Sequence, residues 1–279
     1  MIETTLRDRF HHVLRTVVSE RPAIYLPFAR RKYPGPSPEV ISDETEFVID
    51  GYTRCASTFA VYAFQLAQPR PVRMAHHLHA PAQLIAAARA EIPTLVLIRD
   101  PAGVVLSQVI REPGVSIRDA LFSYTRFYDK LEPYRSSYVV ADFDETTTAF
   151  GHVIRRVNER FGTSYAEFDH TDENVARCVE LIKERPKLSP HLLGFESGTV
   201  TLEQAKKALS ETESISEEAQ RAWVPSTGRS SEKEALRAHW QEPRYRSARR
   251  RAYDVYHQFL LDRDGTHAVD DGLTVSAPS

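Results

Sequence analysis

The sequence predicts a three-layer α/β protein with a central parallel sheet and a helical C-terminal elaboration. Short apolar runs suited to buried strands alternate with helical patterns as far as about residue 162. The clearest of these runs, residues 94–98, is almost entirely apolar, as expected for a parallel strand covered on both faces. Beyond residue 162 only helical patterns continue. Alternation of this kind predicts right-handed strand–helix–strand units, and therefore a parallel sheet.

The elements of the first half follow from apolar spacing and from capping residues. Asp100-Pro101 has the residue types of a helix start, and Gly162 those of a helix end. The expected elements are, in order, a helix at 3–19, an irregular stretch at 20–44, a strand at 47–49, a helix from about 57, a short strand within 71–76, a helix at 81–92, a strand at 94–98, a helix from 101, a helix at 116–134, a strand at 136–143 and a helix at 145–161.

The second half predicts helices and a polar tail. The helical patterns lie at 171–185, 201–209, 215–223 and 231–261. No internal repeat or low-complexity linker divides the chain, so we expect a single domain over 1–264, with the motif-bearing core at about 45–162. Residues 265–279 are small and polar and are expected to form a flexible tail.

Composition limits the classes of function. The chain has 279 residues and a net charge of −2, which gives no overall electrostatic footprint for nucleic acid. No apolar run approaches the ~20 residues that span a bilayer, and the N-terminus has no apolar signal core. The two cysteines, Cys55 and Cys178, have no metal or redox spacing. We expect a cytoplasmic protein that acts on a small molecule; the sequence does not indicate an oligomeric state.

Residues 46–65 organise the prediction of function. They form an apolar strand, a tight loop and a helix start, and backbone N–H groups at a helix N-terminus favour an anion. The spacing from Gly51 to Thr58 matches the phosphate loop of nucleotide hydrolases, but Ala56 replaces the second glycine and Ser57 replaces the lysine. The positive charge stands instead at Arg54. The alternative is a tight turn with a solvated arginine.

Three basic or polar groups follow strands of the predicted sheet. These are the loop around Arg54, the pair Arg99 and Ser107 after residues 94–98, and the histidine cluster at 76–79. Parallel sheets bind ligands at the carboxyl ends of their strands, so we expect the three groups to converge. Taken singly, Arg99 would more often pair with a nearby aspartate, and Ser107 would bond back into its own helix.

The loop and the Arg–Ser pair together resemble the PAPS-dependent sulfotransferases, over about residues 45–162. That family transfers a sulfuryl group from 3′-phosphoadenosine-5′-phosphosulfate (PAPS) to a hydroxyl or amine. Its 5′-phosphosulfate loop has the form [KR]-S-G-T-[ST], and the residues in that register here are Arg54, Cys55, Ala56, Ser57 and Thr58. Its 3′-phosphate element has an arginine at a strand end and a serine eight residues later, which Arg99 and Ser107 match.

The resemblance implies roles for further residues. The family's catalytic histidine, in T-H-x-P, corresponds to His79, with Leu78 in place of the threonine; His77 is the second candidate for the base. In an extended segment His77 and His79 would face the same side. The family's C-terminal Arg-Lys-Gly element is missing, and Arg229 in the basic loop 226–229 is the proposed substitute. A polar loop is the alternative for the histidines, and no metal is expected.

The residue at position 56 tests how tight the loop is. A glycine there would permit φ > 0 and close approach of phosphate to the backbone, whereas an alanine in that conformation would be strained. We therefore expect the chain to be helical from Ala56 onward, because alanine is the best helix former.

The resemblance implies a nucleotide-kinase-like fold and in-line sulfuryl transfer to a small-molecule acceptor, with 3′,5′-diphosphoadenosine (PAP) as product. Arg54 would neutralise growing negative charge, and the base would take the acceptor's proton. The aromatic residues Tyr124, Phe127, Tyr128 and Phe195 are candidates for an acceptor pocket or for the core. Two rival functions remain, a small-molecule kinase or phosphotransferase and a non-catalytic nucleotide-binding protein.

Overall fold

The structure is a computed structural model of the chain. It describes residues 5–263 except 36, 113, 186–189 and 210–226. The predicted helix at 215–223 and the predicted tail at 265–279 lie outside the described residues. The buried side chains form one hydrophobic cluster that runs from Tyr25 to Phe259.

The centre of the fold is a four-stranded sheet in which every neighbouring pair is parallel, as predicted. The strand order is β2-β1-β3-β4. The residues in β1 and β3 are buried, as is all of β2, which explains their unbroken apolar character. The strands are β1 (Phe47–Gly51), β2 (Met74–His76), β3 (Thr94–Ile98) and β4 (Val139–Asp142).

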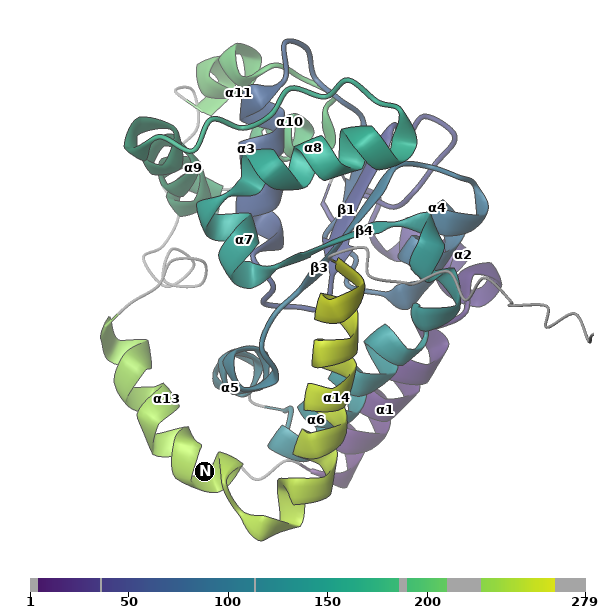
Figure 1. Cartoon of the computed structure of the whole chain (residues 1–279), viewed down its shortest axis with the longest axis vertical. Helices are drawn as coiled ribbons and strands as arrows, with labels where there is room; N and C mark the ends of the chain where they lie inside the picture. Colours follow the sequence, from purple (N-terminus) through teal and green to yellow (C-terminus); the bar gives the residue numbers. More distant parts are fainter. Residues whose placement is uncertain (1–4, 36, 113, 186–189, 210–226, 264–279) are drawn as a thin grey trace, which may run out of the picture.

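Helices cover both faces of this sheet. The described helices are α1 (Leu6–Val18), α2 (Pro22–Lys32), α3 (Ser57–Ala67), α4 (Pro81–Arg89), α5 (Pro101–Arg111), α6 (Ile117–Asp129), α7 (Phe143–Thr148), α8 (Phe150–Phe161), α9 (Asp172–Glu184), α10 (Pro190–Ser197), α11 (Leu202–Leu209), α13 (Thr227–Trp240) and α14 (Arg246–Arg263). Short 3-10 helices at Glu132–Ser137 and Pro243–Tyr245 complete the set. Figure 1 shows the sheet enclosed by this helical shell.

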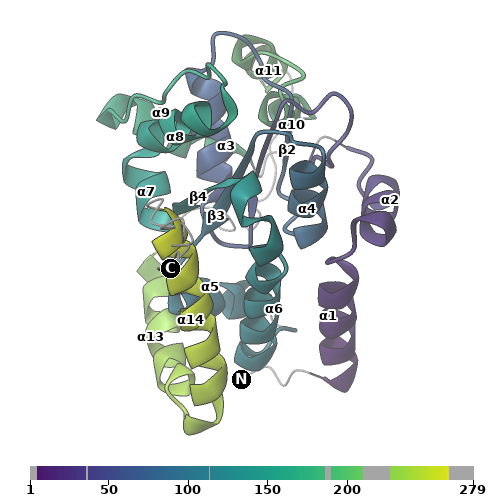
Figure 2. The ribbon, with the colours of Figure 1, turned by 45° about the vertical axis from the view of Figure 1, so that its right-hand side comes forward.

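The handedness of the connections assigns α3 and α4 to opposite faces. The chain moves from β1 through α3 to β2 in one direction, and from β2 through α4 to β3 in the other. Since both crossovers are right-handed, the two helices lie on opposite sides. Figure 2 shows α3 and α8 on one side of the strands and α4 on the other.

Several helix boundaries follow the predicted capping residues. The side chain of Asp100 accepts a hydrogen bond from the Gly103 N–H at the start of α5, and Pro101 occupies the first turn. Gly162 ends α8 in the left-handed conformation. At α1, Thr5 and Asp8 form a reciprocal capping box.

Three expectations for the helices were wrong. The stretch 20–44, expected to be irregular, contains α2, which begins at Pro22. The predicted helix at 231–261 is two helices, because Glu242 adopts an extended conformation before Pro243. Figures 1 and 2 show that α13 and α14 turn back on each other there. The predicted helix at 145–161 is likewise divided at Ala149, between α7 and α8.

Helix α10 was not predicted, although its residues attach the second half of the chain to α3. Glu196 of α10 is fully buried and accepts hydrogen bonds from Tyr62 of α3 and from Arg185. None of the described helices is long and apolar enough to cross a membrane.

Candidate functional site

The candidate site lies where the carboxyl ends of β1 and β3 meet. These two strands are neighbours, and Gly51 at the end of β1 pairs with Leu97 of β3. The helix after β1 covers one face of the sheet, and the chain after β3 continues on the other face. The loops therefore diverge at the carboxyl ends of these strands, which is the usual ligand-binding edge of an open parallel sheet.

The loop between β1 and α3 is tight. A side chain at Gly51 would meet the backbone oxygen of Leu97 at 2.2 Å, so only glycine fits between these strands. Farther along, Arg54 has a φ of 70° and Ala56 a φ of 68°, both in the left-handed region. The expectation that the chain is helical from Ala56 was wrong: Ala56 is the N-cap residue, and α3 begins at Ser57. The alanine accepts strain that a glycine would avoid.

Helix α3 points its N-terminus into this loop. The Ser57 hydroxyl is buried and has no hydrogen-bond partner in the described part of the chain. The N-cap Ala56 supplies no side-chain cap, so the first N–H groups of α3 are not capped by a side chain. Uncapped N–H groups and a buried hydroxyl without a partner form a site suited to an anion.

The loop and the region after β3 are in direct contact. The Nε atom of Arg54 donates to the Ser107 hydroxyl at 3.1 Å, and Nη1 of Arg99 donates to the backbone oxygen of Arg54 at 3.1 Å. Thus the two basic segments, 45 residues apart between Arg54 and Arg99, meet at this edge of the sheet. The predicted convergence of the loop with the pair Arg99 and Ser107 is confirmed.

Packing fixes the orientation of Arg99. Its guanidinium lies 3.7 Å from the centroid of the Phe143 ring, and its backbone oxygen accepts a hydrogen bond from the Tyr124 hydroxyl at 2.9 Å. Burial lowers the pKa of Arg99, but an arginine remains charged at neutral pH. The side chain is therefore a fixed positive charge at the end of β3.

Cys55 points into the core. Its thiol is fully buried, and its sulfur lies 3.6 Å from the Tyr128 hydroxyl. Burial raises the pKa of Cys55 to about 12, so the thiol stays protonated. Only the backbone of Cys55 is available to a ligand.

The histidine segment follows β2 and is anchored by Asp50, a fully buried residue of β1. One carboxylate oxygen of Asp50 accepts hydrogen bonds from the backbone N–H groups of Leu78 and His79, at 3.1 and 3.0 Å. His77 and His79 have positive φ angles of 59° and 50°, so the expected extended geometry was wrong. Their rings are perpendicular, at 83°, with centroids 5.9 Å apart.

The two histidines have different surroundings. Nδ1 of His79 lies 2.9 Å from the Gly51 carbonyl oxygen and 3.2 Å from an Asp50 oxygen. Since a carbonyl only accepts, Nδ1 carries the proton and Nε2 is left as the basic atom. Both ring nitrogens of His77 are engaged within the protein, Nε2 with the Thr58 hydroxyl and Nδ1 with His76.

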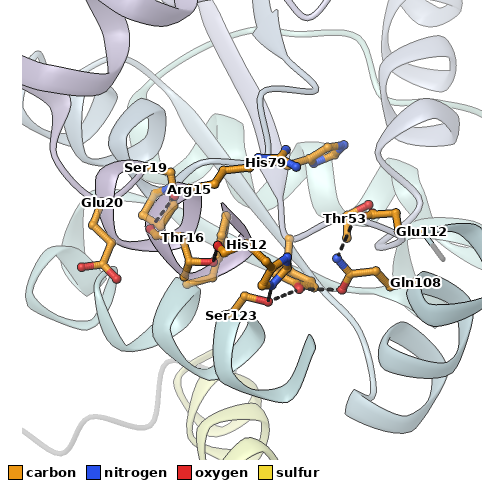
Figure 3. Close-up of a pocket in the computed structure, with 13 residues that line it drawn as sticks. His12, Arg15, Thr16, Ser19, Glu20, Thr53, His79, Gln108, Glu112 and Ser123 are labelled. Carbon is orange, nitrogen blue, oxygen red and sulfur yellow. Dashed lines mark hydrogen bonds between the residues drawn. The ribbon is translucent and has the colours of Figure 1, made fainter. Parts of the chain in front are cut away.

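A cavity of about 170 Å³ begins beside this segment (Figure 3). His79, Pro81, Tyr52 and Thr53 form its border with the phosphate loop. Helix α1 supplies the opposite wall, which the sequence did not indicate. The remaining lining residues come from α1 and the two residues after it, from α5 and the residue after it, and from α6. They are His12, Arg15, Thr16, Ser19, Glu20, Gln108, Glu112, Ser123 and Phe127.

The cavity is polar and internally bonded. The Tyr52 hydroxyl lies 2.6 Å from Gln108 and 2.6 Å from the Ser123 hydroxyl, which in turn lies 3.1 Å from His12 Nε2. Among the aromatic candidates for an acceptor pocket, only Phe127 lines this cavity. Tyr124 and Tyr128 are fully buried in the core, and Phe195 stacks on Tyr62 near α10. The lining therefore suits a polar ligand more than an aromatic one.

Two further sequence predictions concern a third phosphate contact and a metal. Arg229 was predicted to lie in a loop, but it lies in the first turn of α13. Its side chain is outside the described part of the chain. His76, His77 and Glu196 offer potential ligand atoms within 4.8 Å of one another. Glu196 is already bonded to Arg185 at 2.6 Å, and a guanidinium there disfavours a cation beside it. The expectation of no metal stays a prediction.

Comparisons with protein-family models, with curated proteins and with solved structures find no match.

Proposed function

We propose that this protein is a PAPS-dependent sulfotransferase with a three-layer, nucleotide-kinase-like fold. The observation that carries the proposal is the meeting of two separated basic motifs: Arg54 bonds to Ser107, and Arg99 bonds to the Arg54 backbone. PAPS has one phosphate group at each side of its ribose, so two neighbouring cationic sites match it. A nucleotide with a single 5′-phosphate would leave the second cationic site empty.

The loop end of the candidate site would hold the 5′-phosphosulfate. The uncapped N–H groups of α3, the buried Ser57 hydroxyl and the Thr58 hydroxyl are donors at this end. Arg54 would stabilise the negative charge that grows on the bridging oxygen as the S–O bond breaks. Fixed donors of this kind act mainly in the transition state, and removing one typically costs ~100-fold or more in rate.

The other end would hold the 3′-phosphate. Arg99 is immobilised by Phe143, and Ser107 lies within one hydrogen bond of Arg54. Together they would favour PAPS over ATP, which has no 3′-phosphate. The phosphate loop also lacks the lysine that bridges the β- and γ-phosphates in nucleotide hydrolases, which favours sulfuryl over phosphoryl transfer.

His79 is the proposed base. Its Nε2 atom is the basic one, and its side chain is 24% exposed at the edge of the polar cavity. An acceptor hydroxyl in that cavity would attack sulfur while His79 Nε2 takes its proton. The S–O bond to the 5′-phosphate then breaks, the sulfuryl group forms a sulfate ester with the acceptor, and PAP leaves.

The test compares nucleotides by thermal denaturation of the wild-type protein. We expect PAP to raise Tm at concentrations where AMP and Mg-ATP do not, because a ligand stabilises the folded state according to its affinity. Arg99→Ala should lose most of this shift, while Arg155→Ala, at a surface residue paired with Glu167, should retain it. Magnesium-dependent stabilisation by ATP would instead support a kinase. PAP binding without transfer from PAPS to any acceptor would support a non-catalytic binding protein.

A further inference from the structure

A chain of three hydrogen-bonded side chains, of which His76 is buried and the other two are half-buried, lies behind the phosphate loop. Thr58 is in the first turn of α3, and His76 and His77 follow one another at the end of β2. The Thr58 hydroxyl lies 3.0 Å from Nε2 of His77, and Nδ1 of His77 lies 2.7 Å from Nδ1 of His76. The two rings are nearly perpendicular, at 88°. The catalytic scheme above uses neither of these histidines.

Both rings are neutral at physiological pH. Burial lowers the pKa of His76 to about 4, although the nearby Glu196 carboxylate acts in the opposite direction. Burial also lowers the pKa of His77 well below its usual value, with further contributions from the positive charge of Arg185. Each ring therefore carries one proton, on one of its two nitrogens.

The short distance between the Nδ1 atoms fixes a relation between the two tautomers. A hydrogen bond between two Nδ1 atoms needs one donor and one acceptor. One ring therefore carries its proton on Nδ1 and the other on Nε2. If His76 donates, then His77 is protonated on Nε2 and donates to the Thr58 oxygen. If His77 donates, its bare Nε2 accepts the proton of the Thr58 hydroxyl instead.

The second arrangement would make Thr58 a poor phosphate ligand. A hydroxyl has one proton, and an anion such as a phosphate accepts hydrogen bonds. A Thr58 hydroxyl that donates to His77 has no proton left for the ligand. In either arrangement Nε2 of His76 has no hydrogen-bond partner among the described residues, so the bonds at His76 do not favour one direction.

We propose that His76 and His77 form a neutral hydrogen-bond relay that keeps the Thr58 proton available for a bound 5′-phosphate. This inference rests on the proposed function, since the anion at Thr58 selects the direction. In the nucleotide complex His76 Nδ1–H donates to His77 Nδ1, and His77 Nε2–H donates to the Thr58 oxygen. His76 and His77 are thus positioning residues, and neither takes the acceptor's proton.

The first test reads the tautomers directly, by long-range ¹H–¹⁵N correlation spectra of histidine-labelled protein at neutral pH. The His77→Gln variant identifies the His77 signals. We expect one of the two rings to carry its proton on Nδ1 in the free protein, and His76 to be that ring when PAP is bound. Two Nε2–H tautomers, or His77 protonated on Nδ1 in the PAP complex, would overturn the relay. The free-protein spectrum tests the pairing even if PAP fails to bind.

The second test measures affinities for PAP, AMP and adenosine 3′-monophosphate in Thr58→Val, His77→Ala and the double variant. Loss of one hydrogen bond to a charged group predicts roughly tenfold weaker binding of PAP and AMP in Thr58→Val. His77→Ala keeps the Thr58 proton but removes the N–H that orients the hydroxyl, so it should bind PAP and AMP more weakly than the wild type and no more weakly than Thr58→Val. The double variant should bind no more weakly than Thr58→Val alone, because His77 acts on the nucleotide only through the Thr58 hydroxyl. Affinity for the 3′-monophosphate should not change, since it has no 5′-phosphate.

His77→Gln places an amide N–H near the position of Nε2 and should restore most of the PAP affinity. If His77 has a purely structural role, its loss should weaken the binding of all three nucleotides equally, or add to the effect of Thr58→Val. Either result would refute the proposal. Zinc chloride serves as the remaining probe. A zinc-dependent rise in Tm that is lost in His76→Ala would show that these histidines bind a metal with Glu196, and would equally contradict the relay.

Discussion

Asp50→Asn is the substitution that most sharply tests how the histidine segment is held. The buried carboxylate of Asp50 binds on two sides. Its Oδ2 atom accepts hydrogen bonds from the N–H groups of Leu78 and His79 and from the Gln83 amide, at 3.0 to 3.2 Å. Its Oδ1 atom accepts from the Gly51 N–H at 2.9 Å and lies 3.2 Å from Nδ1 of His79. An amide oxygen replaces only one of these two acceptors.

The expected loss follows from which oxygen is replaced. The asparagine oxygen should take the position that accepts three hydrogen bonds, so its NH₂ group would face the backbone N–H of Gly51 and the ring Nδ1–H of His79. The hydrogen bond from Gly51 to a charged acceptor is then lost, which is worth about 1.5–3 kcal/mol. The His79 ring keeps its hydrogen bond to the Gly51 carbonyl oxygen and loses only the nearby negative charge. We therefore predict that Asp50→Asn lowers the free energy of unfolding by about 2 kcal/mol or more.

Urea denaturation followed by circular dichroism measures this change, with Asp43→Asn at an exposed position as the control. The variant should also lose sulfuryl transfer while it retains PAP affinity, because His79 loses its carboxylate partner, whereas the hydrogen bonds that join Arg54, Ser107 and Arg99 do not involve Asp50. A loss of stability under 0.5 kcal/mol, equal to that of Asp43→Asn, would refute the assigned role of Asp50.

Three further predictions concern the base, the loop and the buried histidine. His79→Ala should abolish transfer but leave the PAP affinity unchanged in calorimetry; near-normal turnover would exclude His79 as the base. Ala56→Gly should raise the free energy of unfolding by about 1 kcal/mol, because glycine adopts φ near 68° without strain; a lower urea midpoint would contradict this. The folded pKa of His76 is about 4 against its usual 6.5, so the unfolded chain binds more protons between these values. The contribution of neutral His76 to the free energy of unfolding is therefore fully present above pH 6.5. It is lost as the pH falls toward 4, and the total loss is about 3 kcal/mol. Glu196, Arg185 and Asp50 surround the ring, and His76→Gln should remove that part of the pH dependence measured by urea titration.

The sheet was predictable because its strands are buried on both faces and so appear as short apolar runs. The residues that converge at its carboxyl ends were predictable for a related reason: Arg54 and Arg99 directly follow two neighbouring strands. Parallel pairing then brings them together without any further information. Capping residues such as Asp100 and Gly162 act locally, and they also marked the boundaries correctly.

Other features depend on contacts between distant segments, which no local pattern contains. Helix α1 has ordinary amphipathic spacing, and nothing in residues 6–18 indicates that His12 lines a cavity beside His79. The left-handed conformation of Ala56 opposes the preference of alanine for a helix, and the surrounding loop imposes it. Asp50 directly follows the predicted strand at 47–49, and no local pattern indicates that it anchors the histidine segment. The break at Pro243 is different, since the proline itself was a local signal.

Isothermal titration calorimetry with PAP and AMP tests the central claim, which is that Arg54 and Arg99 bind the two phosphate groups of one nucleotide. We expect the wild-type protein to bind PAP about tenfold or more tightly than AMP, as the loss of one charged hydrogen-bonding group implies. In Arg99→Ala the ratio of the AMP and PAP dissociation constants should fall close to one. Arg99 also donates a hydrogen bond to the Arg54 backbone, and losing that bond would weaken both nucleotides alike and leave the ratio unchanged. Equal affinities for PAP and AMP in the wild-type protein, or an unchanged ratio in Arg99→Ala, would contradict the account.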